Sequence, residues 1–369
     1  MVNKADGMNY APEGKRSPVC GSGEFQIGVV GLDHGHIYGM CNGLTEAGAE
    51  VRLVYDRDPG KLAHFVDRYP GARAARSEME VLENESLRMV ASAIVPSQRG
   101  SLAVKALRHG KAFFSDKPPV HSREALEEIR RMVAATYQRF AVYYSERIHS
   151  EAAVRAGELV EQGAIGRVLQ IVGLGPHRLN ATSRPPWFWD PACNGGILTD
   201  LACHHIEQFL HFSASRRGRC LHAKVGNLHH PEHPQFQDFG DACFLGDTGA
   251  SLYLRVDWFT PDGLSVWGDG RTFIVGTEGS IELRKYVDVG RSDGGDHIYL
   301  VDRTGEHHFQ VAGQVGFPYF GQLIRDCLDG TELAMSHDRI FHVMELSLDA
   351  QACALVMDGG VAALPAVMG

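Results

Sequence analysis

The sequence predicts an α/β protein of two domains: a doubly wound parallel sheet, then an α+β domain with a mostly antiparallel sheet. The chain has 369 residues, which is enough for two domains of ordinary size. Strand and helix signals alternate with short connections in the first half, as in parallel sheets covered by helices on both faces. In the second half, strands come in pairs separated by turns. We therefore expect a flexible leader or surface arm at 1–23, the first domain at 24–146 and the second at 147–369.

The strands of the first domain are expected in short apolar segments. Residues 89–96 are apolar and nearly continuous, which is typical of a strand buried on both faces. A helix is expected over 102–109 with Gly110 as its C′ residue. Ser122 is expected to N-cap the next helix, which carries apolar residues on one face. The predicted strands are 25–31, 51–56, 89–96, 112–115 and 140–144.

The second domain shows antiparallel patterns. Residues 250–259 alternate between apolar and polar side chains, as in a strand that is half exposed to solvent. Residues 271–286 predict two strands around a turn at Thr277-Glu278-Gly279. The other predicted strands are 297–302 and 308–311, and the predicted helices are about 150–162, 199–211, 317–328 and 338–357.

The composition excludes several classes of protein. Hydrophobic residues make up 44% and charged residues 22%, as in an ordinary globular protein, and the net charge of −9 provides no footprint for nucleic acid or an anionic membrane. There is no run of 18 apolar residues that could span a membrane, and residues 1–22 lack the apolar segment of a secretory signal. Eight cysteines without a C-x-x-C pair indicate reduced thiols. We therefore predict a cytoplasmic protein.

A glycine turn follows the first predicted strand, in the segment GVVGLDHGHIYG from Gly28 to Gly39. A strand, a glycine turn and a helix together hold a pyrophosphate at the helix N-terminus. A complete G-x-G-x-x-G would have glycines at 31, 33 and 36, but the chain has Gly31, Asp33 and His36. Asp33 places a carboxylate near the expected pyrophosphate, which is unfavourable unless that side chain turns away or is paired. Dinucleotide binding and a purely structural turn both stay open on this motif alone.

The end of the second predicted strand indicates which dinucleotide would bind. Asp56 lies 20 residues after His36, where a ribose-binding acid belongs in such a unit. Its carboxylate accepts hydrogen bonds from both ribose hydroxyls and repels a 2′-phosphate, while Arg57 offsets part of that repulsion. The pattern favours NAD, and NADP is the alternative.

Two further motifs carry polar groups suited to catalysis. Residues 115–119 read SDKPP after a predicted strand, where a lysine can reach both cofactor and substrate, although a lysine in a proline-rich turn is more often simply solvated. In GGILTDLACHHIE, from Gly195 to Glu207, Asp200 and His204 are four residues apart and share one helix face. A carboxylate beside a histidine suits a proton acceptor, and a surface ion pair is the alternative. The nearby cysteines and histidines match no metal-ligand spacing, so no metal is predicted.

Together these segments resemble the Gfo/Idh/MocA oxidoreductases, the glucose–fructose oxidoreductase and inositol dehydrogenase superfamily. The resemblance covers residues 25 to 355 and rests on four motifs in the family order. These are the glycine turn, the D-K-P at 116–118, the G-G-x-L-x-D-x-x-x-H at 195–204 and the G-T-E-G-S at 276–280.

The resemblance implies a Rossmann domain that binds NAD(H) or NADP(H), and a second domain with a large open antiparallel sheet. That sheet often carries the oligomer interface, so a homodimer or homotetramer is expected. The implied substrate is a sugar, cyclitol or related polyol. Lys117 matches the lysine of the family's E-K-P motif, Asp200 and His204 match the acid and histidine of the second motif, and Glu207 sits where a further acid is common.

The chain departs from the family pattern at three places. Asp116 replaces the usual Glu of E-K-P. The second and third glycines of the turn are missing. The residues after Pro96 read SQRGS, where the family often has a histidine. These departures affect cofactor affinity and orientation more than the fold.

The resulting hypothesis is a reversible oxidoreductase that moves a hydride between nicotinamide and a secondary alcohol or ketone. His204 takes the hydroxyl proton, Asp200 orients His204, and Lys117 hydrogen-bonds the reacting oxygen. The alternatives are a non-catalytic dinucleotide-binding regulatory protein, and a lyase or hydrolase that retains NAD for transient oxidation. The residues expected to bind the cofactor are Gly31, Leu32, Asp33, His34, His36, Asp56, Arg57, Pro96, Asp116 and Lys117; those expected near the substrate are His177, Arg178 and Trp187.

Overall fold

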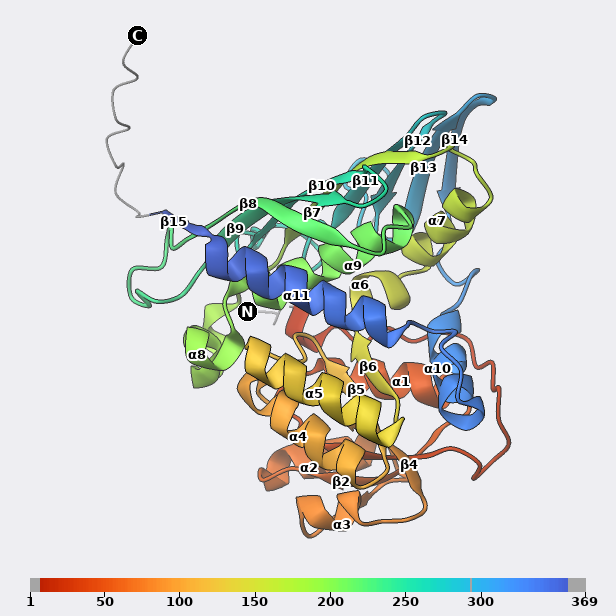
Figure 1. Cartoon of the computed structure of the whole chain (residues 1–369), viewed down its shortest axis with the longest axis vertical. Helices are drawn as coiled ribbons and strands as arrows, with labels where there is room; N and C mark the ends of the chain where they lie inside the picture. Colours follow the sequence, from red (N-terminus) through yellow and green to blue (C-terminus); the bar gives the residue numbers. More distant parts are fainter. Residues whose placement is uncertain (1–6, 293, 358–369) are drawn as a thin grey trace.

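The protein is built on two sheets, which lie at opposite ends of the molecule with helices between and around them (Figure 1). The computed structural model describes residues 7–292 and 294–357. One sheet has six parallel strands and the other has nine strands, most of them antiparallel. The predicted fold class, a doubly wound α/β domain followed by an α+β domain, is therefore confirmed.

The first sheet has the strand order β3-β2-β1-β4-β5-β6 and is covered by helices on both faces. The strand order reverses beside β1, so the carboxyl ends of β1 and β4 open a crevice for a ligand. The strands are β1 (Gln26–Val30), β2 (Glu50–Tyr55), β3 (Arg73–Ala74), β4 (Leu87–Ser92), β5 (Ala112–Asp116) and β6 (Phe140–Tyr143). The helices are α1 (His36–Glu46), α2 (Pro59–Arg68), α3 (Glu78–Leu82), α4 (Pro96–Arg108) and α5 (Arg123–Thr136).

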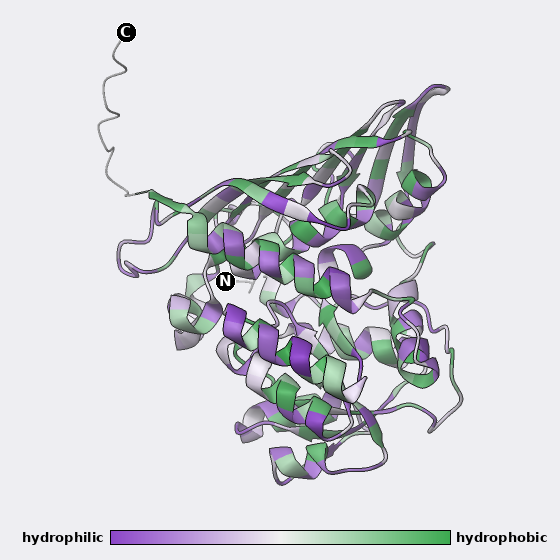
Figure 2. Ribbon diagram, in the orientation of Figure 1, coloured by the Kyte–Doolittle hydropathy of each residue, from purple (hydrophilic) through white to green (hydrophobic). Residues whose placement is uncertain are grey.

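Local sequence explains where these helices begin. Asp58 caps α2 by accepting hydrogen bonds from the amides of Gly60 (2.7 Å) and Lys61 (3.3 Å). Ser122 caps α5 through the amide of Ala125 at 3.2 Å, as predicted. Much of the α5 ribbon that faces the viewer in Figure 2 has the colour of hydrophilic residues, while Leu126, Ile129 and Val133 of this helix are buried.

The second sheet has the order β14-β13-β12-β11-β7-β10-β9-β8-β15. Two neighbouring pairs, β7–β10 and β8–β15, are parallel, and the other neighbours are antiparallel. The strands are β7 (Val168–Pro176), β8 (Gly218–Gly226), β9 (Phe239–Gly246), β10 (Ser251–Asp257), β11 (Arg271–Gly276), β12 (Ser280–Arg284), β13 (His297–Asp302), β14 (Gly305–Gln310) and β15 (Leu355–Met357).

Helices cover one face of this large sheet, and no helix or strand of the described residues covers the opposite face (Figure 1). Buried and half-buried residues alternate along β10, as expected for a strand with one covered face. The helices are α6 (Ser145–Ile148), α7 (Glu151–Glu161), α8 (Pro191–Asn194), α9 (Cys203–Phe212), α10 (Pro318–Asp329) and α11 (His337–Cys353); short 3-10 turns span Gly7–Asn9, Ala181–Ser183 and Pro186–Trp189, and a π-helical turn spans Leu198–Ala202.

Several predicted boundaries are wrong. The strand predicted at 89–96 ends at Ser92, and Pro96 instead begins α4, because proline has no amide hydrogen and suits the first turn of a helix. The helix predicted to reach residue 357 ends at Cys353. Its last predicted residues form β15, where apolar side chains pair with the edge strand β8. The strand predicted at 308–311 spans Gly305–Gln310.

The segment before β1 lies along the first domain as a surface arm. The amide of Ser17 donates to the carbonyl of Glu46, and that of Val19 donates to the carbonyl of Ala47, both at 2.9 Å. These contacts fit the surface-arm alternative for residues 7–22, and the flexibility of the leader stays a prediction. The domain boundary predicted after residue 146 falls within α6. In the described part of the chain, no helix has both the length and the apolar character needed to cross a bilayer.

Candidate active site

A cleft of about 330 Å³ opens at the ends of β1, β2 and β4. Gly31 ends β1 with a φ of +83°, and a Cβ there would lie 2.5 Å from the Cβ of Ile94, so the turn requires glycine. The carboxylate of Asp56 accepts the Leu32 amide at 2.6 Å, which ties the end of β2 to the glycine turn. Four predicted cofactor residues, Gly31, Asp33, Asp56 and Arg57, line the cleft. The turn and the acid fit the adenosine half of a dinucleotide.

Asp33, whose carboxylate was expected to repel a pyrophosphate, is paired. Lys61 on α2 contacts it with Nζ 2.6 Å from Oδ1, and the amide of Val95 donates to the other oxygen at 3.3 Å. Burial by itself would lower the pKa of Lys61, but Asp33 and the nearby carboxylates outweigh it and raise that pKa. Lys61 therefore stays charged and offsets the negative charge at the second motif position.

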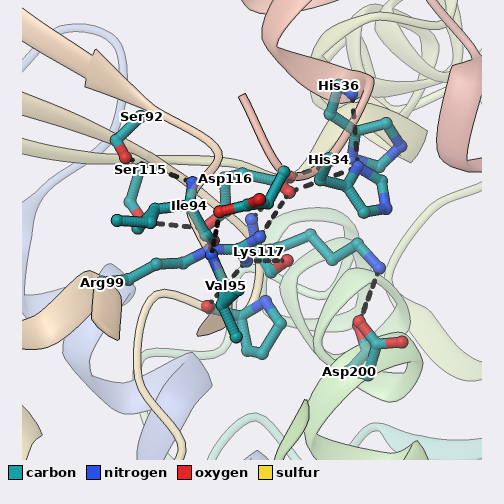
Figure 3. Close-up of polar contacts among 12 residues, drawn as sticks. His34, His36, Ser92, Ile94, Val95, Arg99, Ser115, Asp116, Lys117 and Asp200 are labelled. Atoms are coloured by element: carbon teal, nitrogen blue, oxygen red, sulfur yellow. Dashed lines mark hydrogen bonds and ion pairs between the residues drawn. The ribbon is translucent and has the colours of Figure 1, made fainter. Parts of the chain in front are cut away.

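The D-K-P segment is held by a buried cluster around Asp116 (Figure 3). Arg99 on α4 donates to Oδ2 of Asp116 at 2.9 Å, and also to the carbonyls of Ile94 (2.7 Å), Pro118 (3.0 Å) and Lys117. His36 Nδ1 lies 2.8 Å from Oδ1 of Asp116, which also accepts the amide of Lys117 at 2.8 Å. Both side chains of the Arg99–Asp116 pair are almost fully buried, at 1% and 0% exposed.

His34, His36 and Asp116 have ligand atoms within 4.8 Å of one another, close enough to hold a metal ion. Both oxygens of Asp116 already accept hydrogen bonds, one of them from the guanidinium of Arg99. Burial would raise the pKa of this carboxyl, but Arg99 and the two histidines outweigh burial and hold the pKa well below its usual value. A cation there would compete with Arg99, so we interpret the cluster as an ion-pair network that positions the loop.

Lys117 connects the two domains. Its Nζ lies 2.8 Å from Oδ1 of Asp200 and 3.2 Å from the Asp200 carbonyl, and its side chain is 4% exposed. Burial alone would lower the pKa of Lys117, but Asp200 and Asp116 outweigh it, so the pKa is raised. A charged ammonium therefore stands where the ends of the parallel strands meet the second domain.

The second motif contains a π-helical turn that the sequence did not predict. Asp200 lies in this turn, Leu198–Ala202, and His204 follows in the first turn of α9. Such turns often occur at functional sites. The predicted contact between the two side chains is not formed: Asp200 pairs with Lys117, and among the described residues none bonds Nδ1 of the buried His204. Burial lowers the pKa of His204 well below its usual value, so the ring is neutral.

A small cavity joins these groups. His177 lines it, and its Nδ1 donates to the carbonyl of Gly175 at 3.0 Å, which leaves Nε2 unprotonated in the neutral ring. Burial lowers the pKa of His177 to about 4. The residues around the cavity are Gly7, Met8, His34, His36, Pro96, Arg99, Lys117, His177, Arg184, Trp187, Phe188, Asp200, Leu201 and Trp258.

Three predicted residues lie away from this cavity. Arg178 donates to the carbonyls of Leu264 (2.7 Å) and Pro261 (3.3 Å) and so holds a loop of the second domain. Glu207 is fully buried in an ion pair with Nε of Arg147, at 2.8 and 2.7 Å, which fixes α9 to α6. His204 is not among the residues that line the cavity.

Comparison with known proteins places the chain in a family. Residues 20–144 match the model of the oxidoreductase family with an NAD-binding Rossmann fold, and residues 153–282 match the GFO/IDH/MocA C-terminal domain. A solved structure from Erwinia carotovora atroseptica SCRI1043, described only as an oxidoreductase, is 46% identical with a TM-score of 0.88. It covers 90% of this chain, and the match covers 100% of that chain. The protein belongs to the Gfo/Idh/MocA oxidoreductases. The predicted family, Rossmann domain and NAD cofactor are thus confirmed.

Two curated relatives of this Gfo/Idh/MocA protein are dehydrogenases. The scyllo-inositol 2-dehydrogenase (NAD(+)) of Bacillus subtilis strain 168 is 25% identical over 263 residues, which are 70% of this chain and 73% of that enzyme. The D-xylose dehydrogenase of Paenarthrobacter nicotinovorans is 24% identical over 167 residues. That alignment spans 43% of each chain, so less than half of the D-xylose enzyme is matched.

In this Gfo/Idh/MocA protein, three of the departures from the family pattern meet at one carboxylate, whereas Asp33 at the second glycine position pairs with Lys61. Asp116 stands for the usual glutamate, His36 stands at the third glycine position, and Arg99 lies in the segment that replaces the usual histidine. Arg99 and His36 both bond Asp116 directly. The shorter acid is therefore held by two partners that the family pattern does not predict. Lys61 was also missed, because the family pattern does not place it beside Asp33.

Proposed function

We propose that this protein is an NAD-dependent oxidoreductase that moves a hydride between nicotinamide and a secondary alcohol or ketone of a sugar, cyclitol or related polyol. The observation that carries the proposal is the contact between Lys117 of the Rossmann domain and Asp200 of the second domain. This contact lies in a cavity adjoining the predicted cofactor residues Pro96, His34 and His36. The inositol and xylose dehydrogenase relatives favour a polyol substrate.

In this proposal, the nicotinamide supplies the hydride acceptor when NAD is bound. Lys117 donates a hydrogen bond to the reacting oxygen and stabilises negative charge that develops there. His204 accepts the hydroxyl proton as the carbon–oxygen double bond forms. Asp200 keeps Lys117 charged and positioned, through its 2.8 Å contact.

His177 is the second candidate for the proton acceptor. It lines the cavity, and its hydrogen bond to the carbonyl of Gly175 leaves Nε2 as the free acceptor. Comparing His177→Ala with His204→Ala separates the two assignments. The true acceptor is expected to lose about 10²–10⁴-fold in kcat/KM for oxidation, and the other residue much less.

Asp56 favours NAD over NADP in this proposal. Each of its oxygens accepts one backbone amide, from Leu32 and from Asp58. A carboxylate can accept about four hydrogen bonds, so capacity remains for ribose hydroxyls. Its charge disfavours a 2′-phosphate.

We also propose a homodimer or homotetramer formed through the open face of the large sheet, and a cytoplasmic location. Half-buried side chains such as Tyr253 and Phe273 alternate with buried ones on β10 and β11, and within residues 7–292 and 294–357 no helix or strand covers that face (Figure 1). All eight cysteines are free. Light scattering of the purified protein tests the oligomer, and a single protomer mass would refute it.

The experiment that tests the function is a screen of neutral sugars, cyclitols, and aldonic and uronic acids with NAD⁺ and NADP⁺, read by formation of reduced nicotinamide. Lys117→Met is expected to lose activity, whereas the exposed Lys15→Met is the matched control. Nucleotide binding without turnover of any compound would favour the regulatory alternative. Tightly retained nucleotide with no net reduction during turnover would favour a lyase or hydrolase.

A further inference from the structure

As far as the structure describes it, the N-terminal arm runs parallel to α1, and its first described residues line the cavity that contains Lys117 and Asp200. Residues 17–19 bond the C-terminal end of α1, and the Asn42 side chain donates to the carbonyl of Pro12 at 3.2 Å. Residues 7–10, the first residues that the structure describes, are called the arm tip. Gly7 and Met8 line the cavity together with Lys117 and Asp200.

Both domains hold the arm tip. Nε2 of His36 lies 3.0 Å from the carbonyl of Gly7, and its Nδ1 lies 2.8 Å from Oδ1 of Asp116. The Tyr10 ring packs on Trp267 and Tyr286 of the second domain, with centroids 5.6 and 5.4 Å apart. The arm tip therefore bridges the Rossmann domain and the second domain at the catalytic end of the crevice.

The altered glycine motif makes room for this contact. A Cβ on Gly35 would lie 2.5 Å from the carbonyl oxygen of Met8 and 2.7 Å from Oδ1 of Asn9. Gly35 has φ −65° and ψ −11°, an ordinary helical conformation, so it does not need to be glycine for backbone reasons. Gly35 and His36, two of the residues at which the turn departs from the usual motif, both contact the arm tip.

With the arm tip in place, the cavity measures about 20 Å³, enough for one water molecule. Small-molecule sites usually span about 300–1,000 Å³, so a nicotinamide ring and a sugar do not fit. The rest of the cavity wall comes from helices, from turns and loops that follow strand ends, and from buried ion pairs. Within Gly7–Tyr10, the one backbone hydrogen bond runs from Tyr10 to Gly7, at 3.3 Å. The arm tip is the wall segment that moves at least cost.

We propose that the arm tip occupies the nicotinamide and substrate end of the site in the ligand-free protein, and that it leaves when these ligands bind. This inference rests on the proposed function. It assigns Gly7, Met8 and Tyr10 to the site, and gives His36 the role of holding the arm tip instead of binding pyrophosphate. The adenosine cleft is not lined by the arm, so only the nicotinamide half competes with it.

The test compares NADH with ADP-ribose, which lacks the nicotinamide ring. Calorimetry gives Kd for both ligands with the wild type, with a variant lacking residues 2–11, and with Gly35→Ala. Gly263→Ala is the matched control, because a Cβ there meets nothing within 4 Å. If the closed form makes up about nine-tenths of the molecules, truncation lowers the NADH Kd roughly tenfold. Gly35→Ala lowers it in the same direction, while ADP-ribose affinity stays within about twofold.

An NADH Kd that is unchanged or raised by truncation, with ADP-ribose still bound, would overturn the arm-tip proposal and leave the proposed function standing. Failure of every variant to bind either ligand would overturn the proposed function. In that case acrylamide quenching decides on the arm tip, because Trp267 is 6% exposed and packs against Gly7 and Tyr10. Truncation is expected to increase quenching of Trp267, and unchanged quenching would overturn the placement of the arm tip.

Discussion

Arg99→Met is predicted to destabilise the Rossmann domain strongly. Arg99 is 1% exposed, and its guanidinium bonds Asp116 and the carbonyls of Ile94, Lys117 and Pro118. Methionine fills much of the same space but leaves a buried carboxylate that has lost its strongest partner. Breaking a buried ion pair by removing one side costs roughly 3–5 kcal/mol. We therefore expect the free energy of unfolding to fall by about that amount at neutral pH.

The pH dependence distinguishes this ion pair from a simple packing defect. Burial would raise the pKa of Asp116, but Arg99 and the histidines outweigh it and hold the pKa well below its usual value. A depressed folded-state pKa stabilises the protein above the unfolded pKa of about 3.9, and this contribution is lost as the pH falls through the folded pKa. Removing Arg99 raises the folded pKa. The difference in the free energy of unfolding between the wild type and Arg99→Met should therefore become smaller as the pH falls from 7 towards about 4.

Urea unfolding followed by circular dichroism at the two pH values measures this difference. Arg99→Lys is the matched control: it keeps the charge but not the planar fork, and should lose less, about 1–3 kcal/mol. If Arg99→Met lowers the free energy of unfolding by less than about 1 kcal/mol, or by the same amount at pH 7 and at about pH 4, the reasoning is refuted.

Three further predictions concern the cofactor and the proton acceptor. Lys61→Met leaves Asp33 unpaired near the pyrophosphate, so the NADH Kd should rise roughly three- to tenfold and less at high salt; a rise equal to that of the exposed Lys15→Met would contradict this. Asp56→Ala should raise the KM for NAD⁺ and reduce its preference over NADP⁺ about tenfold, whereas an unchanged ratio from steady-state kinetics would remove Asp56 from the 2′ position. Burial lowers the pKa of His204, so the ring should stay neutral from pH 8 to 6.5, and its protonation should not reduce kcat/KM for oxidation in that range. A fall in kcat/KM over that range that occurs in the wild type and is absent in His204→Gln would be the contrary result.

Much of the fold follows from local patterns in the sequence. Strand β4 lies within a nearly continuous apolar run, and the turn at Thr277-Glu278-Gly279 separates β11 from β12 as predicted. Strand β15 was not predictable because three apolar residues after a helix continue its pattern, and only the exposed edge of β8 makes them a strand. The parallel pairing of β7 with β10 likewise depends on the order of strands within the sheet.

The candidate site was predictable where a residue's place in a motif determines its place in space. Lys117 follows β5 and was expected at the crevice, and the family resemblance gave Asp200 as the acid of the second motif; the two side chains meet. The partners of the ionised groups were not predictable. Lys61 is 28 residues from Asp33 along the chain, Arg99 is 17 residues from Asp116, and neither pair has a local signal. The π-helical turn also redirected Asp200 from His204 to Lys117.

The central claim is that the altered glycine turn still binds a nicotinamide dinucleotide. The most direct test is calorimetric titration of the purified, nucleotide-stripped protein with NADH and NADPH separately. The account predicts that NADH binds and that NADPH binds more weakly, because Asp33 is neutralised by Lys61 and Asp56 disfavours a 2′-phosphate. If neither nucleotide binds to the wild type or to the variant without residues 2–11, the account is contradicted. The protein would then share the family's fold without its cofactor chemistry.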